Sequence, residues 1–523
     1  MSSDEKEKIK SKYDIVVIGS GIGGLTAASL LAKTGKSVLV VEAHDRPGGY
    51  SHGFNRKRYH FDSGVHLTSG CGDQGYVGGQ VIHKLVNAIG VAELIDFIPV
   101  NPFAEARYPG VNVKFPVSIN AFVATLSSLF PGQEQGLRSL LDLCLQVTEE
   151  VAKADEILAE SDHFSEMEKC LPAFHQYRRA TLTDVCREFI QDTKLISLFA
   201  TNWPYLGLPP SRVSFIYWAT MLTGYLVDGA YYCKGGFQQF ANGLVTGLTQ
   251  NHGDIVFKTR VEKIVIEQGR VQGVIIKSGQ RIDSDIVISN ADMRQTVFEM
   301  IGAEFFPRRY IHRLEKMKHS LSIFAVYLAT DLQLQDMGLA HEIFCYQNDD
   351  HEKNFDGVEN AELSFIGITL PTLIDASLAP EGEHLVMLTA LFPYQTEQAW
   401  KELKPVILEK MLDRAELYLP GLKDHLLFVD AGSPETMRRY TQNHQGAAYG
   451  WQVTPDQVGP GRVANKAPIE GLYFAGHWTT PGCGVYGVSV SGMQAAQQIL
   501  GIVSQDKFWR FVESAGNNMR AQS

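Results

Sequence analysis

Two short apolar runs near the amino terminus predict buried parallel strands. Residues 13–18 (YDIVVI) and 37–41 (SVLVV) are rich in β-branched side chains, which is typical of strands that are covered on both faces. Between them, residues 25–33 (LTAASLLAK) place small and apolar side chains at helical spacing, and Gly35 follows as a stop signal. The order of strand, helix and strand predicts a βαβ unit.

The pattern changes several times along the rest of the chain. Residues 80–250 are mostly helical in pattern, whereas residues 255–290 alternate apolar and polar positions between glycine turns, as in a meander of hairpins. Residues 320–430 mix strands with amphipathic helix, and residues 472–476 (LYFAG) predict another buried strand before a glycine-rich turn. We therefore predict an α/β fold in which a discontinuous, Rossmann-type nucleotide-binding domain carries an inserted α+β substrate domain.

Composition places the chain among ordinary globular proteins. It has 523 residues, of which 45% are hydrophobic and 20% are charged, and this length favours about three domains or sub-domains. The formal net charge is −11. Because nucleic-acid binding needs a basic footprint, the acidic balance argues against a nucleic-acid partner.

The cysteines and the amino terminus indicate the compartment. The seven cysteines form no CxxC pair and no cluster with histidine, so we expect neither a disulfide framework nor a metal site, and a reducing compartment such as the cytoplasm or a plastid. Residues 1–12 are charged and contain no apolar segment, which predicts a flexible tail and a protein that is not secreted.

One apolar stretch raises the question of a membrane. Residues 213–227 form an uncharged run of 15 residues, and about 20 are needed to span a bilayer. This run is therefore not a transmembrane helix. It is the best candidate for a monotopic, peripheral membrane contact.

The glycine-rich turn after the first strand is the strongest chemical signal. Gly19, Gly21 and Gly24 fit G-x-G-x-x-G between a predicted strand and a predicted helix, and Glu42 stands at the end of the next strand. In such a turn the backbone approaches a pyrophosphate at the helix N-terminus, and the acidic residue accepts hydrogen bonds from ribose hydroxyls. A carboxylate at this position disfavours the 2′-phosphate of NADP.

A second glycine-rich loop favours FAD over NAD. Arg46, Gly48 and Gly49 follow directly behind the ribose carboxylate. Such a loop can wrap an extended dinucleotide beside the first turn, which an ordinary NAD dehydrogenase does not need. No second dinucleotide fingerprint is visible, so the electron donor or acceptor is not indicated, and neither is the oligomeric state.

The whole of residues 15–49 resembles the FAD fingerprint of the class that includes amine oxidases, Rab GDP-dissociation inhibitors and phytoene desaturases. Further motifs resemble the group of phytoene desaturases, carotenoid isomerases and retinol saturases. They are GF…YHFDSG at 53–64, KGG at 234–236, PTLIDASLAP at 371–380, GSP…RRY at 432–440, GAAYG at 446–450 and EGLYFAGHWTTPGCGVYGVSVSGMQAA at 470–496. The segments PTLIDASLAP and TTPGCGV are more similar to those of carotenoid isomerases, whereas Gly64-Val65-His66 is more similar to the segment of retinol saturases.

The resemblance implies a division of the chain and a set of site residues. The expected segments are a tail at 1–12, FAD-binding segments at 13–110, 251–300 and 431–510, a helical substrate or membrane-facing part at 111–250, a substrate-domain sheet at 301–430 and a tail at 511–523. The expected FAD-binding residues are Gly19, Ser20, Gly21, Ile22, Gly23, Gly24, Glu42, Ala43, Arg46, Gly48, Gly49, Val261, Gly476, His477, Gly484, Gly487 and Val488. His477 departs from the aspartate of carotenoid isomerases and could donate to a phosphate.

The substrate is expected to be a long, apolar conjugated polyene, a carotenoid or retinoid. Phe215, Trp218, Tyr225 and Lys234 are the candidate substrate residues, and Arg438, His444 and Tyr449 the candidate catalytic residues. Most of the chemistry would belong to the flavin.

The first expectation for the reaction is redox-neutral cis-to-trans isomerisation of a carotenoid. Saturation and desaturation of a carbon–carbon double bond are the alternatives. A flavin amine oxidase and a non-catalytic prenyl-lipid carrier remain open as other classes of protein.

Overall fold

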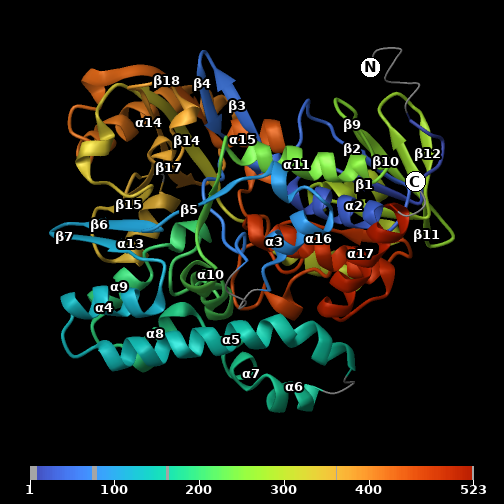
Figure 1. The fold of residues 1–523 in the computed structure, drawn as a ribbon, viewed down its shortest axis with the longest axis horizontal. Helices are drawn as coiled ribbons and strands as arrows, with labels where there is room; N and C mark the ends of the chain where they lie inside the picture. Colours follow the sequence, from blue (N-terminus) through green and yellow to red (C-terminus); the bar gives the residue numbers. More distant parts are fainter. Residues whose placement is uncertain (1–8, 74–78, 161–163, 361, 521–523) are drawn as a thin grey trace.

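The computed structural model describes residues 9–73, 79–160, 164–360 and 362–520. A five-stranded parallel sheet forms one side of the molecule (Figure 1). Its strand order is β19 (Leu472–Phe474), β13 (Ile286–Ser289), β1 (Ile15–Ile18), β2 (Val38–Val41) and β9 (Asp254–Val256). Segments more than 200 residues apart are therefore neighbours, as Ile15 opposite Ile286 shows. The discontinuous Rossmann-type domain is confirmed.

Helix α2 (Ile22–Lys33) joins β1 to β2 and is buried along its whole length. It contacts α11 (Phe237–Gln250), α16 (Val485–Leu500) and α17 (Gln505–Arg520). This surrounding explains why its sequence is small and apolar on every side rather than amphipathic. The antiparallel sheet of β10 (Val261–Glu267), β11 (Arg270–Ile276) and β12 (Arg281–Asp283) is the predicted meander.

A seven-stranded mixed sheet forms the second part of the molecule (Figure 1). Its order is β18 (Leu426–Gly432), β14 (Ser322–Thr330), β17 (His384–Phe392), β16 (Phe365–Thr369), β15 (Glu342–Tyr346), β6 (Ala104–Tyr108) and β7 (Val111–Phe115). Side chains alternate between its faces: Phe324 and Val326 pack in the core that includes Trp400 of α14 (Glu397–Glu416), whereas Ala325 and Tyr327 belong to the main core. One face of this sheet is therefore free to form the wall of a site.

A group of helices forms a separate layer below the two sheets in Figure 1. They are α4 (Ile119–Leu129), α5 (Glu134–Glu160), α6 (Phe164–Cys170), α7 (Pro172–Tyr177), α8 (Leu182–Phe189), α9 (Thr193–Phe199) and α10 (Phe215–Val227). The remaining α-helices are α3 (Val81–Ala88), α12 (Arg308–Lys316), α13 (His351–Glu359) and α15 (Pro434–Thr441). Two strand pairs form separate small sheets: β3 (Gly53–Arg56) pairs with β4 (Tyr59–Asp62), and β5 (Phe97–Pro99) pairs with β8 (Tyr231–Cys233).

Helix α10 places most of the uncharged run inside the molecule. Nine of its thirteen residues are buried, and it packs on α5, where Thr148 and Thr223 share a hydrogen bond of 2.9 Å. Burial in the core explains why most of the run is apolar, and the peripheral membrane contact stays a prediction. Within the described ranges we find no helix that is both long and apolar enough to span a membrane.

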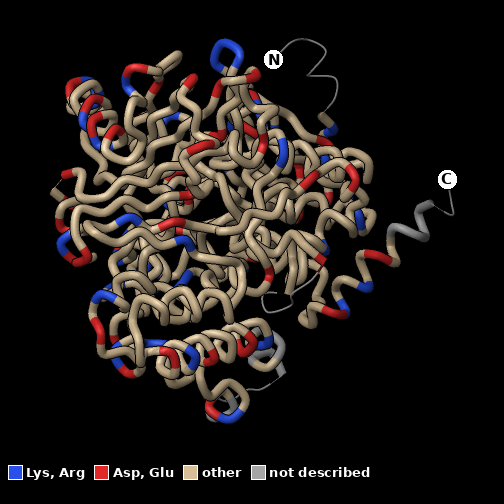
Figure 2. The backbone as a smooth tube through the Cα atoms, turned by 60° about the vertical axis from the view of Figure 1, so that its left-hand side comes forward, with Lys and Arg blue, Asp and Glu red and all other residues tan. Residues whose placement is uncertain are grey.

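Other boundaries also differ from the expected segments. The division at residue 110 falls in the turn between β6 and β7, and both strands pair within the larger sheet. The parallel pairing of β6 with β15 joins residues that are far apart in sequence, and no local sequence pattern predicts it. Helix α17 continues to Arg520, so the expected tail at 511–523 is largely helical, and Figure 2 shows this helix extending outward. Most of the tail at 1–12 lies outside the described residues.

Candidate functional site

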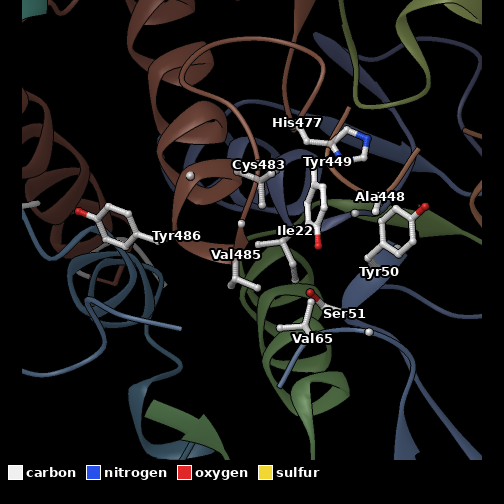
Figure 3. A pocket seen from close by; sticks show the side chains of 18 of the residues that line it. Ile22, Tyr50, Ser51, Val65, Ala448, Tyr449, His477, Cys483, Val485 and Tyr486 are labelled. Atoms are coloured by element: carbon white, nitrogen blue, oxygen red, sulfur yellow. The ribbon is translucent and has the colours of Figure 1, made fainter. Parts of the chain in front are cut away.

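A cavity of about 500 Å³ connects the two parts of the molecule. One end lies at Glu42, directly after β2 of the five-stranded sheet, and at Val261 on β10. The cavity then passes the first turns of α2 and α16 and ends at Glu342 on the seven-stranded sheet. Figure 3 shows its middle, where Tyr449 faces Ile22. A volume in this range is usual for a small-molecule site.

Glu42 lies at the first end of the cavity, directly after β2. Its Oε2 accepts hydrogen bonds from the Ser20 amide at 2.6 Å and the Ser20 hydroxyl at 2.7 Å, and its Oε1 accepts from the His44 amide at 2.6 Å. These bonds fix the carboxylate beside the glycine turn. An ionised carboxylate has about four acceptor positions, so it can also accept from ribose hydroxyls.

The glycine turn is packed more closely than a side chain would allow. A Cβ on Gly24 would lie 2.5 Å from the carbonyl oxygen of Gly19, and one on Gly23 would lie 2.8 Å from the backbone nitrogen of Gly476. The Gly24 amide donates to Oδ1 of Asn290 at 3.0 Å. The turn therefore keeps the N-terminus of α2 directly against the carboxyl ends of β1 and β13.

The second glycine-rich loop lies against the first. Gly21 and Gly48 form a parallel bridge, and the Gly48 amide donates to the Ser20 carbonyl at 2.9 Å. Arg46 donates to the Gly53 carbonyl at 3.0 Å and lines the cavity. Val261 lines the same end, where the Thr259 amide donates to the Glu42 carbonyl at 2.8 Å.

The carboxyl-terminal segment brings a second helix N-terminus to the cavity. Gly484 precedes α16 with φ of 82°, a conformation that suits glycine, and a Cβ there would meet nothing within 4 Å. The first amides of α16 have no partner within the helix and lie at the cavity wall with Gly487 and Val488. Burial and the nearby Arg462 guanidinium lower the pKa of His477 to about 3, so this imidazole is neutral.

Arg462 holds the loop that precedes α16, although sequence reasoning missed it. Its side chain is only 2% exposed. Its guanidinium donates to backbone carbonyls alone, those of Thr479 (2.9 Å), Gln457 (3.3 Å), Trp451 (3.3 Å), Gln452 (3.5 Å) and His477 (2.5 Å). Nothing in GPGRVAN distinguishes this arginine from a surface residue.

The far arm of the cavity is aromatic and apolar. Its lining residues are Tyr205, Tyr217, Met221, Tyr225, Ile323, Phe344, Phe365, Leu391 and Tyr449. Tyr449 is buried and its hydroxyl donates to the Pro204 carbonyl at 2.8 Å. This bond fixes the ring in the cavity, and burial raises the pKa of the hydroxyl, which makes Tyr449 a weak proton donor.

Several expected site residues lie elsewhere, and those expectations are corrected. Arg438 is on the surface, where it binds both carboxylate oxygens of Glu435 at 2.7 and 2.8 Å. His444 lies outside the cavity lining and packs against His319. Lys234 is 56% exposed and pairs with Asp96 at 3.2 Å.

Two further substrate candidates are wrong for a different reason. Phe215 and Trp218 are fully buried on the side of α10 away from the cavity. The face that lines the cavity carries Tyr217, Met221 and the expected Tyr225. Apolar composition cannot distinguish these two faces of one helix, because both are covered.

The motif around Lys234 has a structural use instead. Asp62 accepts from the Phe237 amide at 2.8 Å and the Tyr232 hydroxyl at 2.7 Å, and Asp375 accepts from the Gly235 amide at 2.6 Å. Three segments that are distant in sequence thus meet at the start of α11. They support the wall of the site rather than its chemistry.

The site residues fit FAD. Two helix N-termini and the ribose-binding carboxylate face one elongated cavity, which suits a dinucleotide with a central pyrophosphate. The glycine positions leave room for close backbone approach. Among the residues that the structure describes, no cluster of ligands for a metal ion is present.

The comparisons agree with this site. The model of the family of flavin-containing amine oxidoreductases matches residues 22–500, and the chain belongs to this family. It is a flavin-dependent oxidoreductase of that family, and its cofactor is FAD.

Similar curated proteins extend over nearly the whole chain. A chloroplastic prolycopene isomerase of Daucus carota is 28% identical over 93% of this chain and 80% of its own length. An all-trans-retinol 13,14-reductase of Danio rerio is 25% identical (90% and 83%), and a lycopene-forming phytoene desaturase of Pseudescherichia vulneris is 26% identical (93% and 98%). The family resemblance is confirmed.

Solved structures support the fold. An oxidoreductase from Methanosarcina mazei matches with a TM-score of 0.62 and 20% identity, over 94% of this chain and 100% of its own.

Replacing Glu42 with glutamine is expected to weaken FAD binding by about 10- to 100-fold. The amide group would turn an N–H donor towards Ser20 or His44, which are themselves donors. Fluorescence titration of the apoprotein with FAD measures the change. The exposed Glu262, changed to glutamine, is the control and should bind FAD as the wild type does; equal affinities for all three proteins would contradict the assignment.

Proposed function

We propose that this protein acts on a carbon–carbon double bond of a long conjugated polyene, with cis-to-trans isomerisation of a carotenoid as its reaction. The observation that carries the proposal is the aromatic arm of the cavity, which continues directly from the FAD end. Flat aromatic and aliphatic walls suit a rigid, planar hydrocarbon chain. The names of the relatives, a prolycopene isomerase among them, support the same class of substrate.

In this proposal the chain positions the polyene and excludes water. When bound, reduced FAD would supply electron density to a double bond without net transfer of electrons. The ring of Tyr449 is held in place where the FAD end of the cavity meets the aromatic arm. Ile323 on β14 and Leu391 on β17 form part of the apolar wall of this arm. Met221 on α10 lines the cavity as well.

Anaerobic incubation of the reduced holoprotein with poly-cis lycopene and, separately, with all-trans-retinol tests the proposal. We expect an unchanged mass and a shifted retention time for the carotenoid. A gain of two hydrogens would instead support the second candidate, a saturase, which the retinol reductase relative favours. No conversion of either polyene, together with release of hydrogen peroxide from amines, would overturn the proposal in favour of an amine oxidase.

Narrowing the aromatic arm is expected to reduce turnover of the polyene at least 10-fold without loss of FAD. Ile323 on β14 lines the cavity, and its replacement with tryptophan fills part of the arm. Val429 on β18 is 37% exposed, and tryptophan there is the matched control. Initial rates and the FAD absorbance of both variants are compared; equal turnover would show that the substrate lies elsewhere.

A further inference from the structure

A polar cluster closes the aromatic arm of the cavity at β15 and β16. His66, Glu342 and Thr369 form it: Nδ1 of His66 lies 3.2 Å from Oε2 of Glu342 and 3.1 Å from Oγ1 of Thr369, whose hydroxyl donates to the same Oε2 at 2.9 Å. His341 lies behind them, with Nε2 2.9 Å from the His66 carbonyl. His66 and Glu342 both line the cavity.

Burial of this polar cluster is energetically unfavourable, and the described contacts show no structural role that requires it. Glu342 is 1% exposed, and an apolar residue in its place would pack without a desolvation cost. Within the described part of the chain, the hydrogen bonds of its carboxyl group all involve Oε2, which leaves Oε1 for another donor or acceptor. Burial raises the pKa of Glu342 and lowers that of His66 to about 3, so the neutral forms are favoured.

Tyr205 adds an unsatisfied group to the same place. Its ring lies 6.2 Å from that of His66 and 5.1 Å from that of Phe344, and it lines the cavity. Its hydroxyl oxygen is buried and has no hydrogen-bond partner among the described residues. A buried hydroxyl without a partner is unfavourable, and a ligand that accepts or donates a hydrogen bond there gains binding energy.

We propose that Tyr205, His66 and Glu342 form a binding site for a terminal hydroxyl group, so that a polyene alcohol binds more tightly than the matching hydrocarbon. The inference rests on the proposed function and narrows it. An alcohol both donates and accepts: the Tyr205 hydroxyl donates to its oxygen, and the alcohol proton is accepted by the His66–Glu342 pair. A neutral cluster suits a neutral alcohol better than a carboxylate or an ammonium group.

A site of this kind discriminates strongly against a ligand that lacks the hydroxyl. Without it, buried polar groups of the protein remain unpaired, and such sites reject the deoxy analogue by large factors. We expect the wild-type holoprotein to bind the alcohol at least about 30-fold more tightly than the matching hydrocarbon.

Equilibrium binding to the FAD-loaded protein tests the inference with three probes. They are all-trans-retinol, the hydrocarbon in which its hydroxyl is replaced by hydrogen, and all-trans-retinoic acid, which carries a charge. The variants are Tyr205→Phe and Glu342→Leu, which removes both carboxyl oxygens. Tyr205→Phe removes a hydroxyl that has no partner in the protein, so a loss of affinity reports on the ligand rather than on folding.

Tyr310→Phe is the matched control. The Tyr310 hydroxyl is also buried without a partner in the described structure, but Tyr310 packs in the other core and does not line the cavity. We expect this control to keep the preference of at least 30-fold for the alcohol. In both test variants the preference should fall to about 3-fold or less, through weaker binding of the alcohol and unchanged binding of the hydrocarbon.

The outcomes separate the two proposals. Equal affinity of the wild type for alcohol and hydrocarbon, or tighter binding of the acid, would overturn the hydroxyl site and leave the polyene function standing. If both variants keep the preference for the alcohol over the hydrocarbon, these residues do not form the hydroxyl site. No binding of any of the three retinoid probes would overturn this inference, whereas the polyene function would still be decided by the incubation with poly-cis lycopene.

Discussion

Replacing Gly492 with alanine is expected to lower the free energy of unfolding by about 3 kcal/mol and to abolish retention of FAD. Gly492 lies where α16 crosses α2. An added Cβ would overlap the carbonyl oxygen of Gly23 and lie 2.7 Å from Cβ of Thr26 and 3.0 Å from the Ala27 nitrogen. Two of these atoms are backbone, so no side chain can turn away and the helices must separate.

That separation would move the glycine turn, because Gly23 belongs to it. Urea unfolding and the FAD absorbance of the purified protein measure both effects. Gly487→Ala is the control for the unfolding measurement alone, because Gly487 lines the cavity: its Cβ would lie 3.4 Å from the nearest atom, and alanine is the better helix former by about 1 kcal/mol. The stability of this control should be unchanged or higher, and a Gly492→Ala protein as stable as the wild type would contradict the packing argument.

Replacing Arg462 with methionine is expected to cost at least about 3 kcal/mol of stability. Methionine fills a similar volume but leaves five backbone carbonyls without their donor. The desolvated carbonyls, rather than a lost ion pair, are the cause, since all five partners are neutral. Arg462→Lys should fall between, because an ammonium group has three donors instead of five.

The loop that Arg462 holds includes His477 and leads to α16, so FAD retention should fall with stability. Thermal unfolding of the holoprotein and its FAD content provide the readouts. Arg270→Met, at a residue that is 55% exposed and paired with Glu470, is the control and should change stability by about 0.5 kcal/mol or less. An Arg462→Met protein with normal stability and FAD content would contradict the role assigned to the buried guanidinium.

The dinucleotide site could be predicted from the sequence because its signals are local. A strand, a glycine turn, a helix and an acidic residue follow one another within residues 15–42. Each of them is predicted by the local sequence alone. Asn290 could have been added, since a polar residue directly after a buried strand stands at the carboxyl edge of the sheet, where ligands bind. Its contact with Gly24 completes the turn.

The substrate arm could not be predicted in the same way. Phe215 and Tyr217 lie two positions apart in the same apolar helix, and only the packing of α10 against α5 decides which of them reaches the cavity. His66 and Glu342 are 276 positions apart and meet because the segment after β4 packs against the start of β15, where Nε2 of His341 lies 2.9 Å from the His66 carbonyl. Contacts of this kind depend on tertiary packing, which leaves no periodic trace in the chain.

The order of strands in the small sheet has a consequence for how the protein is made. Strand β1 pairs with β13, and β13 pairs with β19 at residues 472–474, so the sheet cannot be completed before residue 474 has been synthesised. Pairings between such distant segments also form slowly. The first βαβ unit is local and can form early, whereas the complete edge of the sheet that faces the cofactor forms only when segments from most of the chain come together.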